Sequence, residues 1–285
     1  MTPLTIAATS APFGRDLEEC FTRIATLIEE ARAAGVGLLV LPEACLGGYV
    51  ETLHGDAEWP PAFTVDGPEV QRVADLAGDM VVCFGMAEVT AGEDDTMVHN
   101  TAVCVSGGEV LGVHRKVHLP LDEDRITRPG DELAAFDTPV GRIGMLICYD
   151  KAFPEASRTL ALQGAQILCF LSAWPCSATN AAPRLEDDRQ YRRSELWDRA
   201  RAAENSLIVA SANQSGTFGA LRFIGSARVI GPGGDPLAVT STGEGLAIAT
   251  VEDVDAALTR ARRALSPIRD LRPDVYATPA PLAAA

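Results

Sequence analysis

The sequence predicts an α/β protein in which helices flank sheets of mixed strand direction. Short apolar runs alternate with stretches whose apolar residues recur at three- and four-residue steps, a pattern typical of strands followed by helices. Glycine-rich turns that join two apolar runs directly predict antiparallel hairpins as well. The chain has 285 residues, of which 47% are hydrophobic, and no repeat or linker divides it. It can therefore bury one large core, and we expect a single domain over residues 1–285.

The first half of the chain predicts four strands and two helices. Within residues 16–33, Leu17, Phe21, Ile24 and Ile28 recur on one helical face, and Gly35 follows as a stop signal. A second helix is predicted to begin at Pro68, where proline suits the first turn. The predicted strands are residues 4–9, 38–41, 81–87 and 101–105, and the second helix covers residues 68–76.

The second half continues the alternation after a hairpin turn. The turn SGGE at residues 106–109 leads into a strand over residues 110–113. Further strands are predicted over residues 141–148, 167–171, 207–212 and 227–230, and a last pair runs through residues 244–251. Helices are predicted over residues 154–163, 188–205 and 252–264.

Charge and cysteine usage exclude several classes of partner. With a net charge of -15 the chain repels phosphate backbones and anionic lipid, so we expect no nucleic acid and no membrane partner. The N-terminus lacks a basic region and a long apolar run, and no apolar stretch reaches the roughly 20 residues that span a bilayer. Seven cysteines without a CxxC pair predict free thiols in a cytoplasmic protein.

Cys148 differs from the other cysteines in its position. Most of them lie within a predicted helix or apolar strand, where cysteine acts as a small hydrophobe. Cys148 instead ends the apolar run GMLIC and is followed by Tyr149 and Asp150. The carboxyl ends of strands are where sites form in α/β folds, and a strand-to-helix turn can present a nucleophile. Cys148 is therefore a candidate nucleophile.

A thiol nucleophile needs a base, and two charged residues follow apolar strands. Glu43 comes directly after LLVLP, and partial burial there would raise its pKa toward that of a general base. Lys116 follows the strand over residues 110–113 and could stabilise an oxyanion. His114 and His118 flank this lysine, but without a third metal-spaced ligand we interpret them as polar residues near a sheet edge, and no metal is expected.

Glu43, Lys116 and Cys148 together resemble the constellation of the nitrilase superfamily of carbon–nitrogen hydrolases. The resemblance extends from Leu4 to about Val251 and rests on several stretches in order. They are LPEACLGGY, HRKVHLP with the later RPGDEL, GMLICYDKAFPE, ILCFLSAWP, RARAAENSLIVASANQSG and IGSARVIGPGG.

The resemblance implies a fold and an assembly. The fold is a four-layer α-β-β-α sandwich with two mixed sheets. The protein is expected to form a homodimer or a higher homo-oligomer, with contacts through residues 154–163, residues 188–205 and the chain end. Residues 265–285 would form a C-terminal extension that is partly in the dimer contact and loose at its end.

The resemblance also implies a mechanism without a cofactor. Glu43 would take the thiol proton, Cys148 would attack, and Lys116 with the backbone N–H of Tyr149 would stabilise the oxyanion. A second acid that positions the substrate maps to Glu123 by counting back from Pro129-Gly130-Asp131, with Asp122 as the alternative.

The pocket can be predicted only in outline. By position, Tyr49 and Trp174 are either pocket-wall residues or plain core aromatics. Residues 175–190 form a long segment that we expect to cover the pocket mouth. The arginines in and after it could bind a substrate carboxylate, its acids could equally favour an amine, and both could simply be solvated. The arginines are Arg184, Arg189, Arg192 and Arg193, and the acids are Glu186, Asp187 and Asp188.

The predicted reaction is hydrolysis of a small linear amide, or of an N-carbamoyl compound, to an acid and ammonia through a cysteine thioester. Cys-Tyr-Asp followed by Phe-Pro-Glu at residues 153–155 is similar to the amidase side of the family, whereas nitrilases tend to carry Cys-Trp-Glu. Hydrolysis of a nitrile is the alternative. A non-catalytic scaffold subunit is a second alternative, which the intact triad disfavours, and a redox role for Cys148 is a third.

Overall fold

The structure is a computed structural model that describes residues 3–54, 60–91 and 96–276. The expectation of a loose chain end falls on residues 277–285, which lie outside the described residues.

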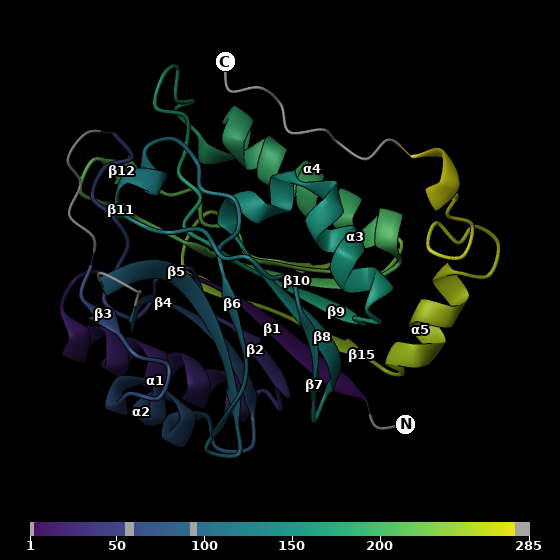
Figure 1. The fold of residues 1–285 in the computed structure, drawn as a ribbon, viewed down its shortest axis with the longest axis horizontal. Helices are drawn as coiled ribbons and strands as arrows, with labels where there is room; N and C mark the ends of the chain where they lie inside the picture. Colours follow the sequence, from purple (N-terminus) through teal and green to yellow (C-terminus); the bar gives the residue numbers. More distant parts are fainter. Residues whose placement is uncertain (1–2, 55–59, 92–95, 277–285) are drawn as a thin grey trace.

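The first sheet is mixed in direction (Figure 1). Its spatial order is β6 (Glu109–Arg115), β5 (Thr96–Ser106), β4 (Val81–Ala91), β2 (Leu38–Val40), β1 (Leu4–Ala11) and β15 (Gly245–Val251). The strands β4, β2 and β1 are parallel, whereas β6, β5 and β15 pair antiparallel with their neighbours. The short β3 (Ala62–Phe63) pairs with β4.

The second sheet is also mixed. Its order is β7 (Ala135–Thr138), β8 (Gly141–Ile147), β9 (Ile167–Ser172), β10 (Ile208–Gln214), β13 (Arg228–Ile230) and β14 (Pro236–Val239). The strands β8, β9 and β10 are parallel, so their carboxyl ends meet at one edge of the sheet. Pairing of Ser10 with Asn213 and of Ala11 with Gln214 joins the two sheets where β1 and β10 end.

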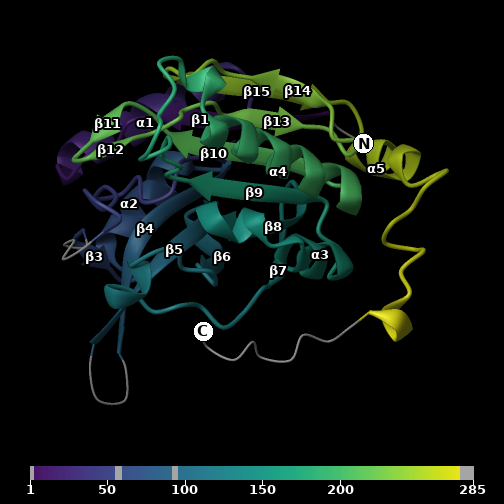
Figure 2. The ribbon, with the colours of Figure 1, turned by 90° about the horizontal axis from the view of Figure 1, so that it is seen from above.

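Three separate cores show that the layers are stacked in the order helix, sheet, sheet, helix. On β4, Val82 and Phe84 pack in the core of α1 (Leu17–Ala33) and α2 (Pro68–Ala77), while Val81 and Cys83 pack between the sheets. This alternation follows from the two-residue period of a strand. Leu168 on β9 packs against the other helices, α3 (Pro154–Leu162) and α4 (Arg189–Asn205). The four-layer α-β-β-α sandwich is confirmed, and Figures 1 and 2 show the helix pairs on opposite sides of the strands.

Most predicted elements are confirmed to within a few residues, and the differences have local causes. β5 begins at Thr96 rather than at residue 101, because the polar residues His99 and Asn100 disguise its first half. β8 ends at Ile147, so Cys148 starts the next turn. The helix α5 (Val254–Ala261) is shorter than predicted, and β7 and the hairpin of β11 (Thr217–Phe218) with β12 (Leu221–Arg222) were not predicted.

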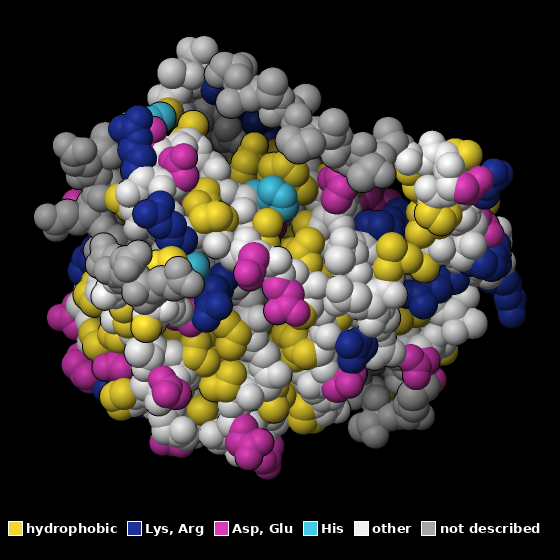
Figure 3. Space-filling view, in the orientation of Figure 1, with side chains coloured by type: hydrophobic (Ala, Val, Ile, Leu, Met, Phe, Trp, Pro, Cys, Tyr) yellow, Lys and Arg dark blue, Asp and Glu magenta, His cyan; other side chains and the backbone are white. Residues whose placement is uncertain are grey.

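The sequence also led to expectations about the membrane, the cysteines, the location and the assembly of the protein. Within the described residues, every helix is too short or too polar to cross a bilayer. All seven cysteines are free thiols, as predicted. The cytoplasmic location and the dimer contact through α3 and α4 stay predictions, and the mass of the protein in solution would test the latter. Acidic and basic side chains are interspersed on the face shown in Figure 3.

Candidate active site

Glu43 lies in the turn after β2 and is fully buried. Its Oε2 accepts a hydrogen bond from the backbone N–H of Ala173 (2.6 Å), at the end of β9. Its backbone oxygen accepts another from the Gln214 side chain (3.1 Å), at the end of β10. Glu43 is therefore held by groups at the ends of two strands of the second sheet, and its Oε1 accepts from Lys116 and Asn100.

The turn that carries Glu43 approaches β4 closely, and a glycine makes this possible. A Cβ atom at Gly85 would lie 2.9 Å from the Cα of Glu43 and closer still to the backbone N of Ala44. Ala44 itself has φ 50°, in the left-handed region that few non-glycine residues adopt. Any side chain at residue 85 would thus displace the Glu43 backbone.

Lys116 binds two carboxylates at once. It follows β6, and its Nζ donates to Glu43 Oε1 (2.9 Å) and to Glu123 Oε2 (2.7 Å) and Oε1 (3.0 Å). The side chain is fully buried. Burial alone would lower the pKa of Lys116, but the carboxylates of Glu123 and Glu43 outweigh it and hold this pKa well above the usual value. Lys116 is therefore a permanent cation in this cluster.

The structure brings Glu123, and not Asp122, into this cluster. Glu123 begins the 3₁₀ helix η1 (Glu123–Arg125) and is 3% exposed. Burial raises its pKa, as does Glu43, and Lys116 opposes both. The Asp122 side chain is 30% exposed and pairs with Arg125 at 3.2 Å.

Asn100 completes the cluster and was missed by the sequence analysis. Its Nδ2 donates to Glu43 Oε1 (2.7 Å) and to Glu123 Oε1 (3.0 Å). It is fully buried on β5, where asparagine is disfavoured, and this conflict with strand propensity was the available signal. The NH₂ group of Asn100 therefore bridges the same two carboxylates that Lys116 binds.

Cys148 lies in a strained turn at the carboxyl end of β8. It begins the 3₁₀ helix η2 (Cys148–Ala152), has φ 46° and is 5% exposed. Such conformations are typical of nucleophile turns. Burial, and then the negative charge and hydrogen bonding of Glu43, raise the pKa of the Cys148 thiol well above its usual value, although Lys116 opposes them. The resting group is therefore a neutral thiol within hydrogen-bond reach of Glu43.

Asp150 fixes this turn with the help of both histidines. Its Oδ2 accepts from the Ile147 backbone N–H (3.0 Å) and from His114 Nε2 (2.9 Å). Its Oδ1 accepts from the backbone and the ring of His118 (3.0 and 2.8 Å). Burial would raise the Asp150 pKa, but the bonds from His114 and His118 outweigh it and hold the pKa far below the usual value. His114 lies on the edge strand β6 and His118 lies just after it, as expected. Both form hydrogen bonds with the buried carboxylate of Asp150.

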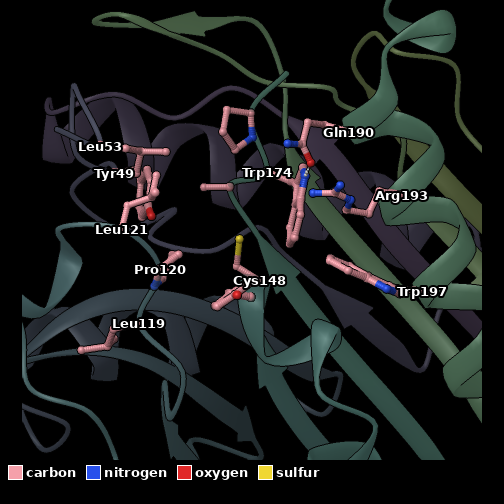
Figure 4. A pocket seen from close by; sticks show the side chains of 13 residues that line it. Tyr49, Leu53, Leu119, Pro120, Leu121, Cys148, Trp174, Gln190, Arg193 and Trp197 are labelled. Atoms are coloured by element: carbon pink, nitrogen blue, oxygen red, sulfur yellow. Dashed lines mark hydrogen bonds between the residues drawn. The ribbon is translucent and has the colours of Figure 1, made fainter. Parts of the chain in front are cut away.

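A cavity of about 340 Å³ opens above Cys148. Tyr49 and Trp174 both line it, and Tyr149 lies beside the thiol. The backbone N–H of Tyr149 is in the first turn of η2, where N–H groups have no partner within the helix. In Figure 4 the Cys148 thiol lies between the wall that carries Tyr49 and the wall that carries Trp174.

The sequence of this chain matches one known protein family over nearly its whole length. Residues 5–261 match the family described as carbon-nitrogen hydrolase. The chain belongs to the carbon–nitrogen hydrolase family. It is therefore an enzyme of the superfamily to which the sequence motifs pointed.

Relatives of this hydrolase include both amidases and nitrilases. A deaminated glutathione amidase of Homo sapiens is 32% identical over an alignment that covers 94% of this chain and 81% of that protein. A nitrilase of Pyrococcus abyssi is 30% identical over 246 residues, 85% of this chain and 86% of that one. The crystal structure of a carbon–nitrogen hydrolase from Helicobacter pylori G27 has a TM-score of 0.81 at 25% identity and covers 96% of this chain and 97% of that one. Amidase activity is thus represented among relatives, and the substrate of this hydrolase has to be argued from its own site.

The segment over residues 175–190 touches the cavity at its two ends. Pro175 and Gln190 line it, and so does Arg193, one turn further along α4. The other arginines point elsewhere: Arg189 donates to Ser177 Oγ, and Arg184 and Arg192 lie near Asp187. Asp188 caps α4 by accepting from the Gln190 backbone N–H and also binds Ser177 and Ala182.

The carboxylates of the site are all engaged by protein donors. In residues 3–54, 60–91 and 96–276 no group of three or more His, Cys, Asp or Glu side chains is arranged to hold a metal ion. The site combines a thiol that lines the cavity with a fully buried carboxylate and a fully buried ammonium group behind it.

Proposed function

We propose that this hydrolase cleaves the C–N bond of a small linear amide, or of an N-carbamoyl compound, and releases an acid and ammonia. One observation carries the proposal: a buried lysine shared by two carboxylates lies beside a buried thiol at the base of a cavity. Glu43, Lys116 and Cys148 are the proposed catalytic residues, and Glu123 is the proposed second acid of the site, which acts through Lys116.

The first half of the reaction forms a thioester. Glu43 accepts the thiol proton as the sulfur of Cys148 attacks the amide carbon, so no free thiolate needs to exist beforehand. Negative charge develops on the amide oxygen, where the Lys116 ammonium and the Tyr149 N–H donate to it. Glu43 then gives its proton to the leaving nitrogen, the C–N bond breaks and ammonia departs.

The second half uses the same groups in reverse. Glu43 takes a proton from water, whose oxygen attacks the thioester carbon, and the oxyanion forms again beside Lys116. The C–S bond breaks, and the thiol recovers a proton from Glu43. Glu123 is a positioning residue in this scheme, because it holds Lys116 through two hydrogen bonds.

Hydrolysis of a nitrile is the second candidate, because a nitrilase is among the relatives. The chemistry would begin with the same attack on carbon. The resemblance of Cys-Tyr-Asp and Phe-Pro-Glu to the amidase side favours the amide. A scaffold protein without activity is disfavoured, since burying a lysine, two glutamates and an asparagine has a large desolvation cost that a scaffold would not need.

The test is ammonia release by the wild type and by Cys148→Ala. The substrates are short aliphatic amides, ω-carboxy and ω-amino amides, N-carbamoyl amino acids and the matching nitriles. We expect release from at least one amide or carbamoyl compound, and background rates in Cys148→Ala. Turnover of nitriles alone, or turnover that survives in Cys148→Ala, would contradict the proposal.

A further inference from the structure

The charge of the cavity lining is unusual for so acidic a chain. Arg193 is the one charged side chain among the described residues that line the cavity. No carboxylate of the described residues forms an ion pair with it, and its guanidinium packs over the Trp197 ring at 5.7 Å. Figure 4 shows the Arg193 side chain extending from α4 toward Trp174. The wall formed by α4 therefore carries an uncompensated positive charge.

Gln190 adds a second donor to the same wall. Its Oε1 accepts from the indole Nε1 of Trp174 (3.2 Å). Because an indole N–H can only donate, this bond fixes which end of the amide is the oxygen. The NH₂ group of Gln190 is left as the other polar end. Gln190 and Arg193 are three residues apart on α4 and so lie on the same face.

The position of Gln190 and Arg193 near the start of α4 also favours binding of an anion. Both residues are in the first turns of the 17-residue helix α4, whose N-terminal end is positive. Three acids nearby are engaged with other partners, and Glu195 lies with Arg192 and Arg199 outside the cavity lining. Asp188 binds the backbone of the loop and caps α4, Asp187 lies with Arg184 and Arg192, and Asp198 binds Lys151 and Arg228.

The rest of the lining is apolar between this wall and the thiol. Leu53, Leu119 and Leu121 face Trp174 and Trp197 across the cavity. Such walls suit a short methylene chain, with one polar end at Cys148 and the other at α4.

We infer that Arg193, with Gln190, binds a carboxylate at the far end of the substrate, so that the preferred substrates are ω-carboxy amides, the monoamides of dicarboxylic acids. This inference rests on the proposed amide hydrolysis and specifies its substrate class. Arg193 is a specificity-determining residue in it: a guanidinium and an amide together donate to both carboxylate oxygens.

The experiment compares two amides of equal carbon number, glutaramate and pentanamide. In the wild type we expect glutaramate to have the higher kcat/KM. In Arg193→Ala the ratio of the two kcat/KM values should fall about 10–100-fold, mainly through a higher KM for glutaramate, since a charge-assisted bond contributes roughly that much. Arg193→Glu should reverse the preference toward 5-aminopentanamide. Arg192→Ala is the matched control, because Arg192 is the adjacent arginine and lies outside the cavity lining; its ratio should equal that of the wild type.

The outcomes separate this inference from the proposed function. A ratio that is unchanged in Arg193→Ala, or that falls equally in Arg192→Ala, would overturn the inference while amide hydrolysis stands. If the wild type hydrolyses neither amide, the panel of amides, N-carbamoyl compounds and nitriles decides the proposed function, and calorimetry of glutaramate with Cys148→Ala and Cys148→Ala/Arg193→Ala decides the inference alone. Binding that weakens about 10–100-fold without Arg193 supports it. Equal binding to both variants, or binding to neither, overturns it.

Discussion

The chain has two lysines, Lys116 and Lys151, and both are buried, but their surroundings differ in charge and in access. Lys116 is shared by two carboxylates at the base of the cavity. Lys151 donates to a single carboxylate, that of Asp198 (2.8 Å), which also accepts from Arg228 (3.0 Å). The first cluster has an excess of acids and the second an excess of bases.

This difference in charge favours the Lys116 cluster, and not the Lys151 cluster, as the one that exchanges protons with a substrate. In the acid-rich cluster one carboxylate can exchange a proton with Cys148 while the lysine remains charged. In the base-rich cluster the single carboxylate is shared by two cations, and these ions hold the turn η2 to α4 and to β13. Arg201 on α4 adds bonds to the backbone oxygens of Lys151 and Ala152. The second cluster is thus a brace behind the nucleophile.

The largest expected effect comes from neutralising an acid in the first cluster. Glu43→Gln keeps the shape of the side chain and removes the proposed base, so kcat should fall about 10²–10⁴-fold while the protein stays folded. Steady-state ammonia release and circular dichroism measure the two effects. Asp122→Asn is the control, because Asp122 is next to Glu123 in the sequence but pairs with Arg125 outside the cluster, and its kcat should stay close to that of the wild type. Equal losses in both variants would contradict the assignment.

Removing the carboxylate of the second cluster should affect stability instead. Asp198→Ala leaves Lys151 and Arg228 as unpaired buried cations, so the free energy of unfolding should fall by about 3–5 kcal/mol. Urea denaturation measures this loss. In Asp187→Ala, which removes an exposed partner of Arg192, the loss should be below about 1 kcal/mol. A kcat loss in folded Asp198→Ala as large as in Glu43→Gln would mean that the two clusters are not distinct in role.

The smallest expected effect is a shift in the pH dependence of Cys148 alkylation. Burial raises the pKa of this thiol most, and Glu43 raises it further, so Glu43→Gln should lower the pH midpoint for its reaction with iodoacetamide. Mass spectrometry over a pH series would show this, with Cys148→Ala as the blank for the other thiols. An unchanged or higher midpoint would mean that Glu43 is protonated in the resting enzyme.

The sign of the accompanying stability change follows from the same shift. Because the folded-state pKa of Cys148 is raised, its contribution to stability is complete below the unfolded thiol pKa of about 8.5 and is lost as the pH rises above it. Asp150 has the opposite sign. Its contribution is complete above the unfolded pKa of about 3.9 and is lost as the pH falls toward its lower folded value.

Much of the fold and the main site residues could be predicted from patterns that are local in sequence. The helical periodicity in residues 16–33 and the apolar runs before Glu43, Lys116 and Cys148 depend only on neighbouring residues. Each of these three residues directly follows or closely follows a strand, so their meeting at one end of the two sheets was foreseeable. The resemblance to a known family then assigned Glu123, although its acidic neighbours made the position uncertain by one residue.

The remaining site residues act through contacts that no local pattern contains. In the sequence, Asn100 is only a polar residue just before a predicted strand. Its role depends on hydrogen bonds to Glu43 and Glu123, which lie on other loops. His114 and His118 gain their role only because Asp150 lies opposite them. Arg193 was one of four candidate arginines, and only the direction of α4 separates it from the others.

The burial of both lysines has a practical consequence for work with this protein. Every other basic side chain is an arginine or a histidine, so a reagent that acylates primary amines finds no exposed lysine on the folded molecule. Unfolding exposes both lysine amines. One of them reports directly on the opening of the candidate active site and the other on the brace behind it, so the order in which they become acylated would give the order in which the two regions unfold.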